Sequence, residues 1–549
     1  MEDTRLAVVP LSQTVAVSRK RLVLVLAGIM LGMSLGALDQ TVVGTAMPRV
    51  IAELNGMEHY AWVFAAYMLA STVMIPIYGK LSDIYGRRPF FLGGMLLFLL
   101  GSALSGASQD MMQLILFRAI QGLGAGAVMP MVQAITGDLF SPIERGKWQG
   151  AIMSLWGLAT IVGPAVGGWI TDSWGWRWVF YVNLPVGALA IITAGVALPP
   201  AGRHTQHKID FAGSSLLIIA AVPLLLAFSW AGTEYAWLSV PIMGLLAFSV
   251  AMFILFFWWE TRASEPIVNP LFFRNSIFGV SVAATFLLSA GMFSALVYTP
   301  LFVQGVMGES ATASGAVMTP HMVAFMFSNI VGGQLLSRTG RYKALALICF
   351  AMATLGMALL ARMDMQTAHE VVVRNVVIMG LGLGIMMTLF TIVVQNAFPP
   401  TDLGQVTANL QFFRSIGATM GTAILGTVLT SQFQARFQAA LPDSLRQAVP
   451  PERLASLQNP QVLLSVQAME TIRSGFLAQT PRGGVLFEQL MVLIRASLAD
   501  AISTVFTVSV AAMALGLVIA FFLREMPLRA TQSTRAPAAH ARRPRVVQR

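Results

Sequence analysis

Charged residues are scarce in this sequence. Asp, Glu, Lys and Arg make up 11% of its 549 residues, while 56% of the residues are hydrophobic. An ordinary soluble domain carries roughly 25% charged residues. So few charges cannot hold the remaining apolar surface in water. The composition therefore excludes a soluble protein and predicts a polytopic membrane protein.

The sequence has a single cysteine and no ATP-binding motif of the P-loop type. The single cysteine, Cys349, excludes an intrachain disulfide and a metal site built from cysteines. No segment reads G-x(4)-G-K-[ST], so we expect a proton gradient rather than ATP as the energy source, and no cofactor or metal. The net charge of +11 comes from basic residues spread over loops and tails. This spread predicts contact with anionic membrane lipids and no nucleic-acid partner.

Long apolar segments are what the sequence has instead. A helix needs about 20 mostly apolar residues to cross the hydrocarbon core of a membrane. Fourteen such windows occur, which predicts an all-α fold with fourteen transmembrane helices. They span residues 22–46, 60–79, 90–107, 111–137, 148–170, 179–198, 211–230, 238–258, 278–303, 313–335, 344–361, 371–397, 405–430 and 504–523.

Basic residues fall in alternate loops between these windows, except for the long loop before the last helix. Arg and Lys concentrate in short cytoplasmic loops, so the alternation gives each helix a direction. An even number of helices places both basic tails on one side. We therefore expect a multi-pass protein of the cell membrane with both termini in the cytoplasm. The first apolar run lacks a clean cleavage site and is expected to be retained as a helix.

One short loop occurs twice. Residues 77–90 read IYGKLSDIYGRRPF, and residues 333–343 read GQLLSRTGRYK. A glycine triplet within residues 122–126 also recurs within 380–384, at nearly the same offset. Repeated turns at one offset predict a chain built from two related halves.

The predicted boundaries follow from this repeat. Residues 432–500 contain five prolines and are expected to form an external loop, either with one or two amphipathic helices at the interface or poorly ordered. We expect a cytoplasmic tail at 1–21, a six-helix bundle at 22–198, two inserted helices with their loops at 199–276, a second six-helix bundle at 277–525 and a basic disordered tail at 526–549.

The segment GKLSDIYGRRP resembles the G-x-L-[AS]-D-x-x-G-R-[RK] signature of the major facilitator superfamily. Further segments resemble its fourteen-helix drug:proton antiporter branch, the EmrB/QacA type. The similarity covers nearly the whole chain and is weakest over residues 432–500. It implies the major facilitator fold, with two six-helix bundles and two inserted helices, in a transporter rather than an enzyme.

Asp39 lies deep in the first predicted helix, where an ionisable side chain is costly and indicates a function. Its context, LDQTVVGTAMP, resembles a pattern in which the Asp is associated with proton coupling. Arg118, in LFRAIQGLGAG, lies at the same predicted depth, roughly 10 Å below the outer surface. A pair whose separation changes would take up and release a proton. The alternatives are a permanent structural ion pair and an Asp that only adds packing polarity.

Residues 155–170, LWGLATIVGPAVGGWI, resemble the G-x(3)-G-P-x(2)-G-G signature of antiporters. Gly163, Gly167 and Gly168 are expected to let another helix approach closely. Pro164 is expected to bend its helix. Together they predict a hinge or an occluding surface, with generic small-residue packing as the alternative.

The first copy of the repeated loop is expected to act as a gate. The resemblance implies that Asp83 contacts the start of the thirteenth helix, near Gly404 and Gln405, where the partial positive charge of a helix N-terminus favours a carboxylate. The alternative is a helix cap without a gating role. Ser337 stands in the second copy where the first has Asp83, so the latch should be one-sided. The gate residues are Gly79, Asp83, Gly86, Arg87 and Arg88.

Other polar residues inside the apolar windows are expected to line a substrate cavity between the halves. Arg414 either lines that cavity or extends to the cytoplasm. His321 either titrates near neutral pH or is simply hydrogen-bonded. The candidates are Gln133, His321, Asn329, Gln395, Asn409 and Arg414.

A further segment, WGWRWVFYVNLPVG, also resembles the fourteen-helix branch. Trp176, Trp178 and Tyr181 are expected in the aromatic belt at the membrane interface. Contact with the substrate is the alternative.

These observations predict a proton-coupled multidrug efflux transporter, a drug:H+ antiporter that exports small lipophilic compounds by alternating access. Asp39 is the only acid placed deep in the membrane, which favours neutral or singly charged substrates over dications. The alternative is a dedicated exporter of a lipid or secreted metabolite. A membrane-embedded enzyme is the remote alternative, because the G-x-S-x-G at 32–36 lies inside a helix without the strand that a nucleophile elbow needs. The resemblance allows an adaptor protein as a partner, but no segment identifies one.

Overall fold

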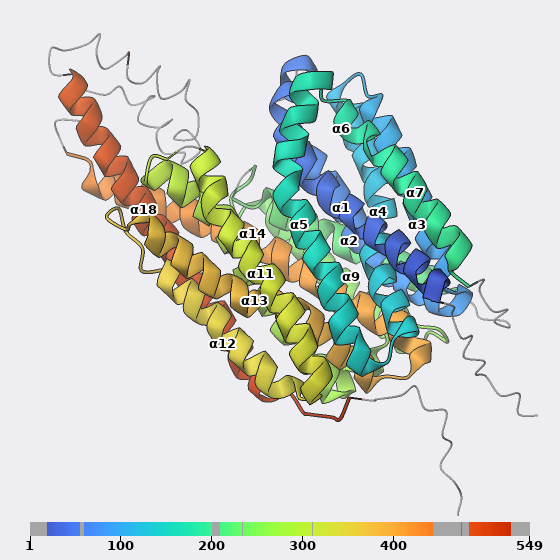
Figure 1. Cartoon of the computed structure of the whole chain (residues 1–549). Helices are drawn as coiled ribbons and strands as arrows, with labels where there is room; N and C mark the ends of the chain where they lie inside the picture. Colours follow the sequence, from blue (N-terminus) through green and yellow to red (C-terminus); the bar gives the residue numbers. More distant parts are fainter. Residues whose placement is uncertain are drawn as a thin grey trace, which may run out of the picture.

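The computed structural model describes residues 19–54, 60–199, 209–232, 234–309, 311–442, 474 and 483–528. Within these ranges the chain is almost entirely helical (Figure 1). Thirteen helical spans of the described chain are long and apolar enough to cross a membrane. Most of the predicted basic tail, and the amphipathic helices expected within residues 432–500, lie outside the described residues.

The first bundle contains the helices before residue 199. α1 packs against α5 and α7, and α4 packs against α2 and α3. Buried Phe91, Phe98 and Met131 lie in its core. The helices are α1 (Arg19–Leu54), α2 (Tyr60–Tyr85), α3 (Arg87–Gly106), α4 (Met111–Leu139), α5 (Pro142–Trp174), and the short α6 (Trp178–Tyr181) and α7 (Asn183–Ala197), which together fill the sixth predicted window.

The second bundle follows a short 3-10 turn, η2 (Pro270–Arg274). Its helices are α10 (Ser276–Leu301) with the π-helical turn η3 (Phe302–Val306), α11 (Ala311–Thr339), α12 (Tyr342–Leu360), α13 (His369–Ala397), α14 (Leu403–Ala440, preceded by η4, Pro400–Asp402) and α18 (Gly483–Phe521). α11 is not one of the thirteen apolar spans of the described chain. It packs between α13 and α5, so His321 and Asn329 face protein rather than lipid. Each of the fourteen predicted windows falls on a helix.

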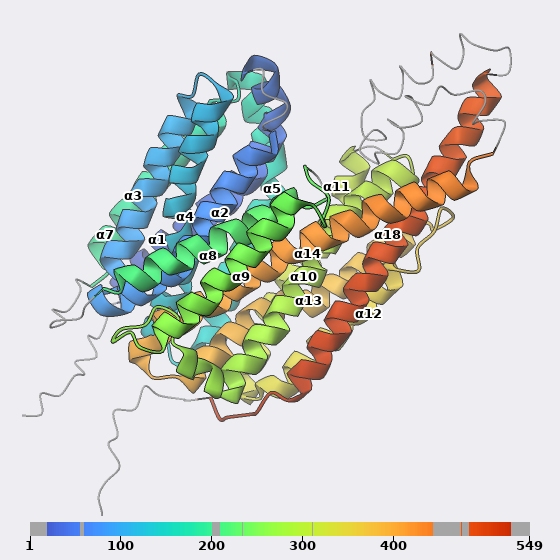
Figure 2. The same cartoon turned by 180° about the vertical axis from the view of Figure 1, so that it is seen from behind.

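A helical hairpin joins the two bundles. α8 (Phe211–Trp230) and α9 (Val240–Glu260) pack against each other, and α8 also contacts α2 of the first bundle and α14 of the second. Asp210 caps α8 by accepting a hydrogen bond from the Gly213 amide at 2.7 Å. Figure 2 shows the hairpin lying across the junction between the bundles.

Several helices extend beyond their apolar windows. α5 begins at Pro142 because Ser141 and Glu144 form a capping box before the apolar run starts. α14 has 38 residues, or about 57 Å, which exceeds the ~30 Å hydrocarbon core. Residues 432–440 and 483–500 are therefore helical, so the structure differs from the expected external loop at both ends. Phe433 and Phe437 are buried in the same core as α18, and this packing supports the extension.

The bundles are in close contact at one end, which we call the inner end and which is marked by Gly79 and Gly333. A Cβ at Gly79 would lie 2.2 Å from the Ala408 Cβ on α14, and a Cβ at Gly333 would lie 2.2 Å from the Gly146 oxygen on α5. Figures 1 and 2 show that the bundles diverge toward the opposite end, which we call the outer end. The repeated glycines thus make equivalent contacts in the two halves.

Each of the two repeated turns contains a glycine with a positive φ. Gly86 has φ of 90° and Gly340 has φ of 64°, a region that side chains rarely adopt. Both glycines lie at the inner end, each between two consecutive helices. The sequence repeat therefore corresponds to a structural one.

Candidate functional site

Asp39 and Arg118 are in contact inside the first bundle. The Arg118 Nη1 lies 2.7 Å from the Asp39 Oδ2, and both side chains are at most 1% exposed. Gln121 donates to the Asp39 Oδ1 at 2.8 Å, and Asn183 donates to the same oxygen at 3.1 Å. The carboxylate therefore receives three hydrogen bonds, which compensate its buried charge.

The guanidinium is held as firmly as the carboxylate. Arg118 also donates to the Gln121 Oε1 at 2.8 Å and lies 4.2 Å from the centre of the Tyr67 ring. Such pairing offsets the large cost of burying two charges. All of these partners come from the first bundle, so the pair lies within one half and not between the halves. Sequence reasoning missed Gln121 and Asn183, although both stand in segments that resemble the family.

The antiporter-like segment of α5 packs directly beside this pair. A Cβ at Gly163 would lie 1.9 Å from the Thr41 Oγ1, and one at Gly167 would lie 2.4 Å from the Thr45 Oγ1. α5 thus presses on the turn of α1 that follows Asp39. Gly168 differs from the expectation, because a Cβ there would meet nothing within 4 Å. Pro164 lies within the continuous helix α5.

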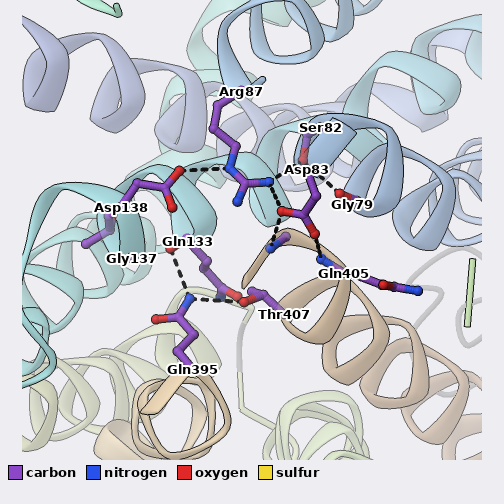
Figure 3. Close-up of polar contacts among 12 residues, drawn as sticks. Gly79, Ser82, Asp83, Arg87, Gln133, Gly137, Asp138, Gln395, Gln405 and Thr407 are labelled. Carbon is purple, nitrogen blue, oxygen red and sulfur yellow. Dashed lines mark hydrogen bonds and ion pairs between the residues drawn. The ribbon is translucent and has the colours of Figure 1, made fainter. Parts of the chain in front are cut away.

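Asp83 reaches the start of α14, the contact that the resemblance implied (Figure 3). Its Oδ1 accepts from the Gly404 amide at 2.8 Å, and its Oδ2 accepts from the Gln405 amide at 2.6 Å. These N–H groups lie in the first turn of a helix, where they have no acceptor within the helix and where the helix carries partial positive charge. The contact joins the first bundle to the second at the inner end.

Arg87 completes this cluster. It forms ion pairs with Asp83 and, at 2.8 Å, with Asp138 on α4, and it donates to the Ser82 hydroxyl at 2.8 Å. Arg88 is half-buried and forms no hydrogen bond or ion pair with this cluster among the described residues. The gate loop is therefore crosslinked to α4 as well as to α14.

Gln405 also holds the segment that follows α9. Its side-chain amide donates to the Pro266 oxygen at 2.6 Å and to the Ile267 oxygen at 2.7 Å. Glu265 of the same segment pairs with Lys80 on α2 at 2.6 Å. The backbone of Gln405 thus contacts the gate loop, while its side chain contacts the segment that follows the inserted hairpin.

Two of the predicted cavity residues meet across the bundles at the inner end. The Gln395 amide donates to the Gln133 backbone oxygen at 3.2 Å and to the Thr407 hydroxyl at 3.0 Å (Figure 3). Gln149 on α5 approaches the Gln395 Oε1 at 3.5 Å. These amides are buried, so in this conformation they form a polar seal rather than a cavity wall.

The other four predicted cavity residues lie within the second bundle. His321 contacts the Val376 oxygen through its Nδ1 at 2.8 Å, and Asn329 accepts from the Thr388 hydroxyl at 3.0 Å. Arg414 is buried and bonds to Gln411 on its own helix. The Asn409 amide is fully buried, and neither of its polar atoms has a hydrogen-bond partner among the described residues.

A cavity of about 500 Å³, which we call the outer cavity, lies between the outer halves of α2, α10 and α14 and the end of α8. Among its described lining residues are none of the six predicted ones. Its walls combine apolar side chains such as Met68 and Phe228 with threonine hydroxyls. In this conformation the predicted polar residues therefore lie at buried positions outside this cavity.

The tryptophans of the 174–187 segment divide between two environments. Trp178 is 49% exposed, as an interfacial residue would be, but Trp176 is only 2% exposed and donates to Glu53 at 2.7 Å. The expectation of a belt position for Trp176 is wrong. Hydrogen bonds from Arg177 and Trp176 hold the pKa of Glu53 below its ordinary value.

The fold and the site together define a class of protein. The two helical bundles are in close contact at one end, and one of them contains a buried ion pair. This arrangement is typical of a membrane carrier built from two halves. The described residues contain no group of three or more His, Cys, Asp or Glu side chains that could hold a metal ion.

Comparisons with known proteins agree with this class. The model of the Major Facilitator Superfamily matches residues 29–422. Multidrug transporter protein MdtP of Bacillus subtilis is 41% identical over 409 residues, which are 74% of this chain and 75% of that protein. Multidrug resistance protein 3 of the same bacterium is 39% identical over 416 residues, which are 76% of this chain and 81% of that protein.

A solved structure supports the fold. The human organic anion transporter MFSD10 (TETRAN) superimposes with a TM-score of 0.56 at 15% identity, covering 89% of this chain and 99% of that one. The chain belongs to the major facilitator superfamily. It is a multi-pass membrane transporter and not an enzyme.

Proposed function

We propose that the protein is a drug:proton antiporter of the fourteen-helix branch, which exports lipophilic compounds across the cell membrane. The inner end faces the cytoplasm, as the basic loops favour, and both termini lie there. The observation that carries the proposal is the fully buried pair of Asp39 and Arg118. The printed names of the two Bacillus relatives support drugs as substrates.

Asp39 serves as the proton carrier. While Arg118 and the two amides surround it, the buried charge of the carboxylate is compensated. If α1 moves and these partners withdraw, that compensation is lost. Such a rearrangement would link proton uptake at Asp39 to the movement of α1.

α5 links this carboxylate to the movement of the halves. On one side its Gly163 touches Thr41, two residues from Asp39. On the other side its Gly146 and Gly150 meet the backbone of α11 in the second bundle, with a Cβ at Gly150 lying 2.6 Å from the Asn329 oxygen. A shift of α5 against α11 must therefore disturb the packing around Asp39.

The Asp83 contact acts as the cytoplasmic latch. When it opens, the buried amides of Gln133, Gln395 and Asn409 become exposed to water and line the cavity that faces the cytoplasm. An unpaired buried amide such as Asn409 costs about 1–3 kcal/mol, so exposure to water relieves an unfavourable contact of the closed conformation. This supports two conformations of comparable free energy.

Dye efflux tests the proposal. Energised cells that express the protein should extrude a lipophilic dye, and a protonophore should stop the extrusion. Asp39→Asn should abolish the extrusion while the protein still folds, because the amide cannot carry a proton. Asp172→Asn, at an exposed acid near Arg49, is the matched control and should extrude normally.

Two outcomes would decide against it. Uphill extrusion that survives collapse of the proton gradient, or full extrusion by Asp39→Asn, would contradict proton antiport. Dye that is retained with and without the protonophore would favour the dedicated exporter of a lipid or metabolite.

A further inference from the structure

The outer cavity has walls from both bundles and from the inserted hairpin. α2 contributes Ala65, Met68, Leu69 and Thr72 from its outer half, and α14 contributes residues between Thr419 and Thr430. Val297, Tyr298 and Leu301 of α10 close one side. At about 500 Å³ the cavity matches the size of sites that hold drug-sized ligands, roughly 300–1,000 Å³.

The turn of the inserted hairpin is fixed over this cavity. Gly232, with φ of 79°, is so close to α14 that a Cβ there would lie 2.3 Å from the Thr427 Oγ1. Trp237 donates to the same hydroxyl at 2.5 Å. Trp230 at the end of α8 packs edge-on against Trp62 of α2, with ring centres 5.4 Å apart. The hairpin is thus part of the cavity wall and not a spacer.

Charge is missing from this wall. None of the described lining residues is Asp, Glu, Lys, Arg or His. A permanently charged ligand would lose its hydration there without gaining a counter-charge. The cavity therefore suits an uncharged molecule with a large apolar body.

Three threonine hydroxyls in the wall have their protons already engaged, whereas the hydroxyls of Thr72 and Tyr298, which also line the cavity, have no acceptor among the described residues. Thr422 donates to the Ala418 oxygen at 2.7 Å, and Thr419 donates to the Ser415 oxygen at 3.1 Å. Thr430 donates in the same way to the Gly426 oxygen at 3.1 Å. A threonine hydroxyl has one proton and two acceptor lone pairs, so these groups can only accept further bonds.

We propose that the outer cavity binds uncharged lipophilic substrates that carry hydrogen-bond donors, with the inserted hairpin as part of the site and Thr422 as an acceptor. This assignment rests on the proposed export function, because it makes the bound molecule a transported substrate. Phenols and alcohols have the required chemistry. Their ethers, which have the same apolar body but no donor, cannot form a hydrogen bond to Thr422.

Equilibrium binding to the purified full-length protein in detergent, without a proton gradient, tests the site. The probe is hexestrol, an uncharged bisphenol, and its dimethyl ether serves as the donor-free analogue. Hexestrol should bind about threefold to tenfold more tightly than the ether for each hydrogen bond that the ether loses. Tetraphenylphosphonium, a permanent cation, should not displace it.

Two variants test whether the probe binds in the outer cavity. Thr422→Val should weaken hexestrol about threefold to tenfold and leave the ether unchanged. Gly426→Leu should weaken both, because its side chain enters the cavity, where a Cβ meets only the Tyr298 hydroxyl at 3.4 Å. Thr354→Val is the matched control: Thr354 also donates to its own helix, to the Phe350 oxygen at 2.8 Å, but lies on α12 away from the cavity.

The outcomes separate this site from the export function. Equal affinity for hexestrol and the ether, displacement by the cation, or equal losses in Thr422→Val and Thr354→Val would overturn the site. In that case proton-dependent dye efflux could still be intact. Hexestrol binding could also follow the predicted pattern in a protein that shows no proton-dependent efflux. That result would support the site and contradict the proposed export function.

Discussion

Burial of the Asp39 carboxylate is unfavourable, and its ion pair with Arg118 compensates that cost. Removing one partner of a buried ion pair costs about 3–5 kcal/mol, because the other charge remains buried without compensation. Arg118→Gln leaves the carboxylate with only Gln121 and Asn183 as donors. We expect this variant to lose about 3–5 kcal/mol of unfolding free energy. Thermal unfolding in detergent measures the loss.

The double variant Arg118→Gln/Asp39→Asn provides the control for that experiment. It contains no buried charge at this place, so it should be more stable than Arg118→Gln alone. Losses that simply add would mean that the two side chains do not interact, in conflict with their distance of 2.7 Å.

Gly163 and Gly168 form a natural matched pair of positions on α5. Gly163→Ala places a methyl group against Thr41 and must displace α1 near Asp39, whereas Gly168→Ala meets open space. We expect Gly163→Ala to reduce proton-dependent efflux severalfold and Gly168→Ala to leave it unchanged. Equal activity of the two variants in the dye assay, at equal expression, would separate this glycine from coupling.

Single residues differed in how well the sequence revealed them. Asp39 and Arg118 were predictable as a pair, because a buried charge requires a partner and both lie at one depth. Gln121 and Asn183 were not, because an amide in an apolar window does not reveal which way it points. Thr422 carries no signal at all, since threonines within helices commonly donate to their own backbone.

At the scale of helices, the apolar cores were predictable and the ends were not. Membrane thickness sets how many apolar residues a helix needs, so all fourteen windows fall on helices. Their ends depend on other contacts. Ser141 caps α5 before its apolar run, and packing of Phe433 and Phe437 extends α14 beyond it.

The start of α14 yields a prediction about Gln405. Gln405→Ala keeps the backbone contacts to Asp83 but removes both side-chain bonds to the segment after α9. The inner end should then open more often, by about threefold to tenfold for each hydrogen bond of roughly 0.5–1.5 kcal/mol. An Asn409→Cys reporter in a Cys349→Ser background measures this, because Asn409 is fully buried when the inner end is closed.

The rate of maleimide labelling at this reporter is the readout. Gln434→Ala, on the outer part of the same helix, is the control and should label at the parental rate. An unchanged rate in Gln405→Ala would mean that the inserted hairpin does not hold the latch in place.

For the whole molecule, the internal repeat explains the shape but not the charge at the latch. Gly79 and Gly333 make equivalent contacts in the two halves, so the two-bundle arrangement was predictable from the repeated loop. Ser337, which stands where the first loop has Asp83, donates only to the Gln334 oxygen of its own helix at 2.9 Å. The charged contact is therefore one-sided, and the two halves differ in how they are held.

The proposed alternating access requires the inner seal to open during each cycle, and a cross-link across the seal tests this requirement. Gln149 and Gln395 lie on α5 and α13 of opposite bundles, 3.5 Å apart between polar atoms. In a Cys349→Ser background, Gln149→Cys/Gln395→Cys treated with a short bifunctional thiosulfonate should lose dye efflux, and reductant should restore it. In each single variant, the same treatment should leave the activity at its level before treatment. Hexestrol binding should survive cross-linking, because the outer cavity lies toward the other end. Efflux that continues in the cross-linked protein would mean that transport does not pass through an opening of this seal.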